Sequence, residues 1–280
     1  MKVRQLRPSD TRAALMLLNS DPATNLYQID VLLRNPLPAF NLYEWRGVFV
    51  NQELIAISLS AARLKPNTPS SLCVPFGDLD GCRLLGEAEA KMGGTENLLG
   101  PKDASDMLYD GLGQPEAPVW TDEQLYVCQQ QGVDEPYLTI RPAKIEELDV
   151  LEPMAAQMQI EDIGSDPRKG DIDAHRQRIA QQIKHNRIWV ADVDSQIAFS
   201  LNVGTHSPLG VQVGSIFVPT HMRRRGIATR AMRGANLHFL RQSAMVTLLV
   251  RTDNVPAIRA YQNANYVGHT DFRLAELNLG

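Results

Sequence analysis

Short runs of alternating apolar and polar residues predict strands, and apolar residues three and four positions apart predict the helices between them. In the second half we expect, in order, a strand at 137–141, helices at 145–160 and 172–185, a hairpin at 188–203, a strand at 211–218, a helix at 227–241, a strand at 246–251, a helix at 255–263 and one bent strand or a strand pair at 266–274. Hairpins combined with one strand–helix–strand crossover predict a mixed α/β fold with a mostly antiparallel sheet flanked by helices.

Three short segments of the first half recur in the same order in the second half. Residues 5–8 resemble 139–142, residues 55–60 resemble 197–202, and residues 72–75 resemble 216–219. This order indicates a tandem duplication, although two unrelated α/β stretches can share such strand segments. A polar stretch with Gly and Pro separates the two halves, so we predict domains at 1–130 and 137–280 joined by a linker at 131–136.

Charge is spread unevenly along the chain. Hydrophobic residues make up 44% and charged residues 21% of the 280 residues, as in an ordinary globular protein. From Val211 onward the chain has nine arginines, no lysine and three acidic residues, a balance of +6 within a total net charge of −4. This asymmetry indicates an anionic ligand, either a nucleic acid or a compact polyphosphate, with a solvated basic face as the simpler alternative.

Cysteine usage and hydropathy narrow the class of protein further. Cys73, Cys82 and Cys128 form no C-x-x-C pair, and an odd number cannot all pair within one chain. We therefore expect a reducing compartment and no metal site. The N-terminus is charged where a signal peptide is apolar, and no apolar run reaches membrane-spanning length. The sequence thus predicts a cytoplasmic protein without a membrane partner.

An arginine-rich turn carries the main chemical signal. Residues 223–229, Arg-Arg-Arg-Gly-Ile-Ala-Thr, join a predicted strand to a predicted helix. Glycine lets the backbone approach a ligand closely, and the unpaired N–H groups at a helix start attract anions. The segment is neither a G-x-x-x-x-G-K-[ST] nor a G-x-G-x-x-G loop. It therefore favours a phosphate-bearing ligand of another kind, with an exposed capping loop as the alternative.

A second segment lies about thirty residues further on. Asn254 precedes a predicted helix with Pro256 in its first turn, and Ala257 and Tyr261 share one helix face. The tyrosine is either an aromatic core residue or a proton donor.

Taken together, Val218-Pro219, R-x-x-G-x-A at 223–228 and N-x-P-A-x-x-x-Y at 254–261 resemble the GNAT superfamily of acyl-CoA N-acyltransferases over about 137–277. The resemblance implies two tandem GNAT-like domains, with a strand at 216–218 that diverges from 246–251 to admit acetyl-CoA. It also implies roles for Val218 as backbone oxyanion donor and Tyr261 as general acid. The implied coenzyme contacts are Ile216, Phe217, Val218, Arg223, Arg224, Arg225, Gly226, Ile227, Ala228, Thr229, Asn254 and Tyr261.

The sequence departs from the family pattern where a catalytic base is needed. The strand at 211–218 has no carboxylate, whereas many GNAT enzymes have a glutamate there. Glu161 and Asp162, expected in a loop at 161–167, are the candidate bases, unless they are only surface charges. His206 is a weaker candidate, and a chain of waters could relay the proton instead.

The first half resembles a degenerate copy of the second half, without the features expected to bind a diphosphate. Its counterpart of the arginine-rich turn contains Asp78 and Asp80, and no arginine before Arg83. Carboxylates repel a diphosphate, so we predict that residues 1–128 do not bind acyl-CoA. We expect a strand at 97–101 and a helix at 102–112. Within this helix, Tyr109 is the expected counterpart of Tyr261.

The sequence therefore predicts an N-acetyltransferase that uses acetyl-CoA and an amine, either a small molecule or a protein amine, in a ternary complex. A non-catalytic acyl-CoA sensor or scaffold is the main alternative. Binding of nucleic acid is disfavoured because the arginines flank a glycine turn without stacking aromatic residues.

Overall fold

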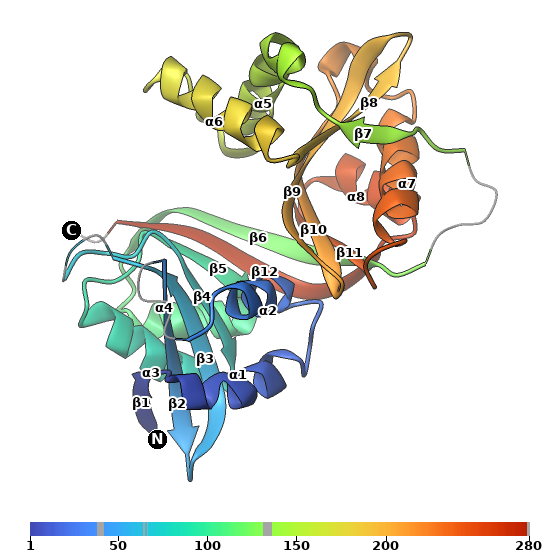
Figure 1. Cartoon of the computed structure of the whole chain (residues 1–280). Helices are drawn as coiled ribbons and strands as arrows, with labels where there is room; N and C mark the ends of the chain where they lie inside the picture. The colour runs from blue at the N-terminus through green and yellow to red at the C-terminus, as the bar shows by residue number, and fades with distance from the viewer. Residues whose placement is uncertain (38–41, 64, 66, 131–135, 279–280) are drawn as a thin grey trace. The chain divides into compact units, whose positions relative to one another are not determined.

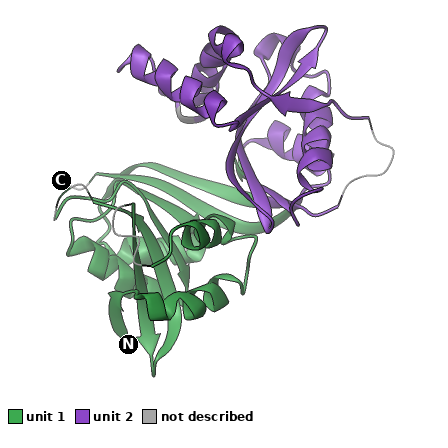
Figure 2. Cartoon of the chain, in the orientation of Figure 1, with its two compact units in different colours: residues 1–125, 249–253, 268–280 green, residues 126–248, 254–267 purple. Residues whose placement is uncertain are grey.

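A computed structural model describes the chain apart from residues 38–41, 64, 66, 131–135 and 279–280. The described residues form two compact units (Figure 2), the first made of 1–125, 249–253 and 268–280 and the second of 126–248 and 254–267. The expected linker covers residues 131–136. Residues 131–135 lie outside the described residues, so the structure describes only Pro136 of this segment. The expected division at 1–130 and 137–280 differs from these units mainly at 268–280, which belong to the first unit.

The first unit is an α/β layer structure built on one sheet. Its elements are β1 (Lys2–Gln5), η1 (Pro8–Asp10), α1 (Thr11–Leu18), α2 (Leu26–Arg34), β2 (Tyr43–Val50), β3 (Glu53–Ala61), β4 (Cys73–Gly77), α3 (Leu79–Ala90), β5 (Asn97–Pro101), α4 (Lys102–Gly111) and β6 (Glu116–Cys128), of which residues 126–128 are assigned to the second unit. The strands follow the order β1-β2-β3-β4-β5-β12-β6. β12 (Val267–Asn278) joins this sheet by antiparallel pairing with β5, which is why the end of the chain belongs here.

The second unit repeats this succession of elements (Figure 1). It contains β7 (Ile140–Pro142), η2 (Ile145–Glu147), α5 (Leu148–Ile163), α6 (Ile172–Lys184), β8 (Ile188–Val193), β9 (Gln196–Ser207), β10 (Gly210–Phe217), η3 (Thr220–Met222), α7 (Ile227–Phe239), β11 (Val246–Arg251), of which residues 249–251 are assigned to the first unit, and α8 (Val255–Gln262). Its strands follow the order β11-β10-β9-β8-β7, with β10 and β11 parallel and the others antiparallel. The predicted fold, a tandem repeat of mixed and mostly antiparallel strands flanked by helices, is confirmed.

Helices cover both faces of the second unit's sheet. Ile188 and Val190 are buried in an apolar cluster with residues of α5 and α6. Trp189, between them, packs against Phe239 of α7 with ring centroids 5.2 Å apart. Because successive side chains of a strand point to opposite faces, α5 and α6 lie on one side of β8 and α7 on the other.

An ion pair at the start of each unit shows the register of the repeat. Arg4 contacts Asp10 at 2.6 Å, and Asp10 also accepts the backbone N–H of Arg7. Arg141 contacts Glu147 at 2.7 Å, and Glu147 accepts the N–H three residues before it. Arg141 is therefore structurally equivalent to Arg4. The sequence match paired Arg141 with Arg7 instead and was three residues out of register.

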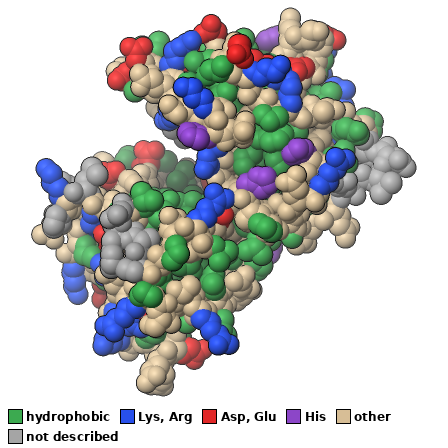
Figure 3. Space-filling model, in the orientation of Figure 1, with side chains coloured by type: hydrophobic (Ala, Val, Ile, Leu, Met, Phe, Trp, Pro, Cys, Tyr) green, Lys and Arg blue, Asp and Glu red, His purple; other side chains and the backbone are tan. Residues whose placement is uncertain are grey.

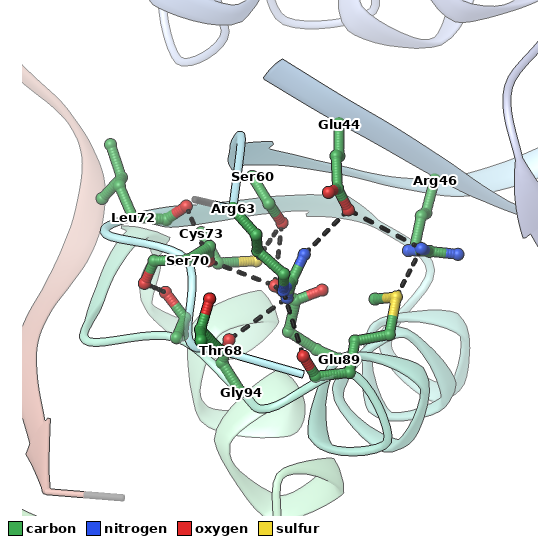
Figure 4. A network of polar contacts seen from close by, with 12 residues as sticks. Glu44, Arg46, Ser60, Arg63, Thr68, Ser70, Leu72, Cys73, Glu89 and Gly94 are labelled. Atoms are coloured by element: carbon green, nitrogen blue, oxygen red, sulfur yellow. Dashed lines mark hydrogen bonds and ion pairs between the residues drawn. The ribbon is translucent and has the colours of Figure 1, made fainter. Parts of the chain in front are cut away.

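Buried polar contacts hold the interior of the first unit (Figure 4). One Glu89 carboxylate oxygen accepts hydrogen bonds from Arg63 at 2.6 Å, Ser60 at 3.0 Å and Ser70 at 3.2 Å. Arg63 also donates to Glu44 at 2.7 Å. Because a buried charge is costly unless it is paired, these contacts tie α3 to β2, β3 and the loop that precedes β4.

The expected elements of the second unit are present with shifted ends. Of the strand expected at 137–141, only Ile140 and Arg141 are in β7, because the N–H of Leu138 donates to the carbonyl of Arg230 in α7. The region expected at 266–274 forms the single strand β12. Pro153 lies within α5 without ending it.

Candidate active site

Strand β10 separates from its parallel neighbour partway along its length. It pairs with β11 only opposite Val246 and Thr247. Its pairing with β9 is irregular between Gly214 and Phe217, where Ser215 has a φ of +48°. Such a bulge bends a strand and interrupts its ladder. The end of β10 therefore diverges from β11, as expected.

The start of α7 presents a run of backbone N–H groups. Gly226 is the N-cap with a φ of +68°, and Arg224 also has a positive φ, +61°. The first hydrogen bond of the helix runs from the N–H of Arg230 to the carbonyl of Gly226 at 3.1 Å. Within the described chain, no backbone N–H from Arg224 to Thr229 donates a hydrogen bond. Together with the helix dipole, these groups can bind an anion.

The three arginines of this turn differ in their contacts. Arg223 donates to the carbonyl of Val218 at 2.9 Å and to Glu161 at 2.6 Å, and its guanidinium lies over the Phe217 ring. Arg225 is 3.5 Å from Asp194, and both side chains are exposed. Such an exposed pair is weak, so the charges of Arg224 and Arg225 remain available to an anion. Arg223 instead braces the turn.

Glu161 and Asp162 lie in the last turn of α5, so the expected loop placement was wrong. The helix continues because its stop signal is Gly164, with a φ of +74°, beyond both acids. Burial alone would raise the pKa of Glu161, but hydrogen bonds from Gln157 and Arg223 and the charge of Arg223 lower it overall. The structure thus places Glu161 beside Arg223, which also contacts the carbonyl of Val218.

Tyr261 is a buried side chain of α8, with 6% of its surface exposed. Within the described residues its hydroxyl makes no hydrogen bond, whereas the neighbouring Tyr266 hydroxyl donates to Asn236 at 2.7 Å. Burial raises the pKa of Tyr261, and the nearby negative charge of Asp162 raises it further. The hydroxyl therefore keeps its proton at neutral pH, which a general acid requires.

Two polar side chains fix the start of α8 and its link to α7. The Asn254 side-chain oxygen accepts the N–H of Ala257 at 3.3 Å and so caps α8. Thr229, in the first turn of α7, donates to the carbonyl of Ala260 at 3.3 Å. The side-chain nitrogen of Asn254 remains able to donate to a ligand.

His206 does not lie with these residues. It pairs with Val211 in the β9–β10 ladder, at the first end of β10, and its ring packs near Phe239. Val218 follows the other end of β10, so the weaker base candidate is far along the strand from the expected thioester position.

A cavity beside the end of β10 holds residues that the sequence did not indicate. Its volume is about 250 Å³, and it is lined by residues of α5, α6, β8, β9 and β10. His175 lines it and contacts the buried Glu152. Within an amphipathic helix, a single buried polar residue gives no periodic signal, so sequence patterns could not identify this pair.

Across the part of the chain that the structure describes, no three His, Cys, Asp or Glu side chains gather closely enough to hold a metal ion. In that part, too, every helix is too short or too polar to cross a membrane.

Comparisons with known proteins identify the second half. The model of the acetyltransferase (GNAT) family matches residues 157–266, so this segment is a GNAT acetyltransferase domain. No curated protein matches the sequence. Nearly the whole chain shares its fold with solved structures described as GNAT acetyltransferases, one of them a tandem GNAT protein.

Three solved structures illustrate this shared fold. An acetyltransferase from the GNAT family of Colwellia psychrerythraea matches at 10% identity with a TM-score of 0.57, covering 99% of this chain and 100% of that one. A GCN5-related N-acetyltransferase from Sphaerobacter thermophilus matches at 15% identity with a TM-score of 0.59, covering 98% and 94%. A tandem GNAT protein from the clavulanic acid biosynthesis pathway matches at 10% identity with a TM-score of 0.53, covering 100% and 98%. At these identities the comparison establishes the fold alone.

Proposed function

We propose that the second unit transfers an acetyl group from acetyl-CoA to an amine by direct attack in a ternary complex. The observation that supports this most is the run of backbone N–H groups from Arg224 to Thr229 without acceptors in the described chain, beside the charges of Arg224 and Arg225. A diphosphate, such as that of coenzyme A, offers the oxygens that such a turn binds.

The divergent end of β10 would hold the other end of the coenzyme. Backbone groups of 216–218 would pair with its pantetheine arm, helped by the side-chain nitrogen of Asn254. The N–H of Val218 donates no hydrogen bond within the described chain. Directed at the thioester oxygen, it would stabilise the developing negative charge by about 2–4 kcal/mol, as other oxyanion donors do.

Proton transfers would involve Tyr261 and an acid at the end of α5. Tyr261 would protonate the leaving thiolate, since its raised pKa keeps the hydroxyl neutral. An alkyl amine is mostly protonated at neutral pH, so Glu161, Asp162 or a water must accept its proton. Because Arg223 lowers the pKa of Glu161, Asp162→Asn should shift the pH profile of kcat/KM more than Glu161→Gln.

Direct attack, without a covalent intermediate, is supported by the cysteine content of the second unit. Cys128 is its one cysteine, and burial raises the pKa of this thiol to about 11. A thiol with so high a pKa is a poor nucleophile at neutral pH. All three cysteines are buried free thiols, which supports the cytoplasm as the proposed compartment.

One observation favours a second candidate, a non-catalytic acyl-CoA sensor. β10 has no carboxylate side chain, and Glu161 is held by Arg223. Such a protein would bind acyl-CoA without turning it over.

Calorimetric titration with acetyl-CoA, followed by a thiol-release assay with a panel of amines, separates these candidates. An acetyltransferase binds acetyl-CoA in competition with inorganic pyrophosphate and releases thiol only when an accepted amine is present. Binding without amine-dependent release supports the sensor. Absence of binding at millimolar acetyl-CoA would refute both.

A further inference from the structure

The cavity beside β10 lies between the helices α5 and α6 and the strands of the second unit. One face of α6 lines it, through four residues at helical spacing: His175, Arg178, Ile179 and Gln182. Ser215 and Phe217 line it from β10, immediately before the backbone at Val218. Its volume of about 250 Å³ is at the small end of ligand sites. The cavity therefore suits a small molecule near the strand end that is proposed to hold the thioester.

Arg178 gives the cavity wall its charge. Among the described residues that line the cavity, no side chain is acidic. Arg178 is exposed, and across the described chain it makes no ion pair and one hydrogen bond, from Nη2 to His175 Nδ1 at 2.8 Å. A guanidinium has five N–H donors, so most of those on Arg178 remain open to a ligand in the cavity.

Acids of α5 that lie near the cavity are paired with other cations. Asp149 pairs with Arg176, and Glu161 pairs with Arg223 at 2.6 Å. Figure 3 shows basic and acidic side chains exposed together over α5 and α6, so the surface around the cavity is of mixed charge. The positive charge of Arg178 is therefore a local property of the cavity wall.

His175 positions this guanidinium. Arginine only donates, so Nδ1 of His175 accepts its hydrogen bond, and the hydrogen of the neutral imidazole is on Nε2. Nε2 lies 3.4 Å from Oε1 of the buried Glu152, which is not part of the cavity wall. The imidazole thus connects a buried carboxylate to Arg178 and holds the guanidinium at the cavity.

The remaining polar side chains of the wall are uncharged amides and hydroxyls: Gln159, Gln182, Asn202, Ser200 and Ser215. All five residues are half-buried or exposed, so a ligand in the cavity can reach them. Amides and hydroxyls both donate and accept, and they serve ligands of either charge. Arg178 consequently determines which charge the cavity prefers.

A carboxylate complements this wall. Its two oxygens match the paired N–H groups of a guanidinium, which makes such contacts both strong and directional. An alkyl amine without a carboxylate is cationic at neutral pH, and Arg178 repels it. A molecule with both groups would place its carboxylate at Arg178 and its amine away from it, along β10 toward Val218.

We propose that this cavity selects small amino acids as acetyl acceptors, with Arg178 binding their carboxylate. The assignment to the acceptor rests on the proposed acetyl transfer. Lysine side chains and N-termini of proteins are poor acceptors under this proposal, because the carboxyl groups next to them are in peptide bonds.

Three probes with equal numbers of non-hydrogen atoms test the charge preference: pentanoate, pentanamide and hexan-1-amine. Each is titrated into the full-length protein without coenzyme, while the ¹³C-methyl signal of Met158, which lines the cavity, is followed by NMR. We expect pentanoate to bind about fivefold more tightly than pentanamide, because charge-assisted hydrogen bonds are stronger than neutral ones and solvent weakens those of an exposed arginine. The amine should bind most weakly. Equal binding of pentanoate and pentanamide, tightest binding of the amine, or no shift with any probe overturns the proposal.

Variants of two arginines on α6 locate the effect. Arg178→Gln should remove the preference for pentanoate and leave binding of pentanamide unchanged. Arg176→Gln is the matched control, since Arg176 pairs with Asp149 and does not line the cavity, and it should keep the preference. Arg178→Lys retains the charge without the paired donors and should keep part of it. A preference that survives Arg178→Gln, or that Arg176→Gln removes equally, contradicts the assignment.

Acetyl transfer separates this proposal from the proposed function. Straight-chain amino acids with one to five carbons between amine and carboxylate are each compared with their primary amides, and kcat/KM is expressed per free amine because the shortest pairs differ in amine pKa. At the best-accepted length we expect the acid to exceed the amide by about fivefold, and Arg178→Gln to abolish this difference. Equal kcat/KM for acids and amides would keep the acetyltransferase and overturn the cavity's role. A binding preference for pentanoate without any thiol release would keep the carboxylate site and overturn both the transfer reaction and the acceptor assignment.

Discussion

The equivalent turns of the two units have the same position but opposite chemistry. In each unit, a strand that pairs with its parallel neighbour over a very short length is followed by a helix. β4 pairs with β5 at a single position, and β10 pairs with β11 at two. In the first unit only Asp78 separates β4 from α3, whereas residues 218–226 separate β10 from α7. The second turn is thus much longer, and it contains the arginines.

The two helix starts also differ in how their N–H groups are used. The Asp78 side chain accepts the N–H of Gly81 at 2.9 Å, and Asp80 adds a second negative charge to the first turn of α3. Gly226 has no side chain to do the same for α7. A few residues at a helix start thus determine whether its N–H groups are capped by a carboxylate or left open to an anion. We therefore retain the prediction that the first unit does not bind acyl-CoA.

The two equivalent tyrosines differ in the same way. The Tyr109 hydroxyl donates to the carbonyl of Pro115 at 2.7 Å, and its ring packs against Trp120. The Tyr261 hydroxyl makes no such bond within the described chain. One tyrosine hydroxyl has a structural partner, and the other has none among the described residues.

Exchanging each tyrosine for phenylalanine should give the largest contrast. Tyr261→Phe should lower kcat about 100-fold or more, the usual effect of losing a general acid, with little change in acetyl-CoA affinity. Tyr109→Phe should leave kcat unchanged. Steady-state thiol release measures both variants, and full turnover by Tyr261→Phe would exclude its role as the acid.

Placing a carboxylate at the open helix start should make the second turn resemble the first. A Cβ at Gly226 meets no atom within 4 Å, and both Asp and Asn tolerate positive φ, so Gly226→Asp and Gly226→Asn form a matched pair. The aspartate should weaken acetyl-CoA binding about tenfold or more relative to the asparagine, by charge repulsion. Equal affinities in calorimetry would show that the diphosphate does not bind there.

Removing the cap of the first turn should affect stability alone. Asp78→Ala should lower the free energy of unfolding by about 1 kcal/mol, because it leaves the N–H of Gly81 without its acceptor. Thermal unfolding measures this loss, and acetyl-CoA affinity should not change. Calorimetry of this variant should show the same number of coenzyme sites per chain as the unaltered protein. An additional site would mean that Asp78 alone prevents the first unit from binding the coenzyme, and would contradict our view that the first unit differs in more than this residue.

The smallest effect concerns the ion pair that braces the second turn. Arg223 and Glu161 are both more than a third exposed, so Arg223→Gln should cost less than about 1 kcal/mol at pH 7. Because the pKa of Glu161 is lowered in the folded protein, this stabilisation is present above the ordinary carboxyl pKa and is lost as the pH falls through the lowered value. The difference in Tm from the unaltered protein should therefore vanish in acid. A difference that persists at pH 2 would assign it to packing against Phe217.

Local signals explain what could be predicted from the sequence. Pro219, Gly226 and the Asn254–Pro256 segment mark strand and helix ends through their own backbone preferences, so α7 and α8 begin as expected. The arginine-rich turn between β10 and α7 was located for the same reason.

The remaining features depend on contacts between distant parts of the chain. The bulge at Ser215 and the positive φ of Arg224 depend on packing against other parts of the chain. The types of these two residues therefore could not predict them. Glu152 and His175 meet only because α5 and α6 pack together, and β12 pairs with β5 across more than 160 residues of chain. The two acids at the end of α5 were misplaced because Gly164 was not taken as the helix stop.

The membership of β12 in the first unit has a consequence for biosynthesis. A ribosome must translate the entire second unit before the strand that lies beside β5 emerges. Until then, β5 exposes an unpaired edge, which is a site of misassembly in partly folded chains. The first unit therefore cannot complete its sheet until the second unit has been synthesised, which couples the folding of the first unit to synthesis of the whole chain.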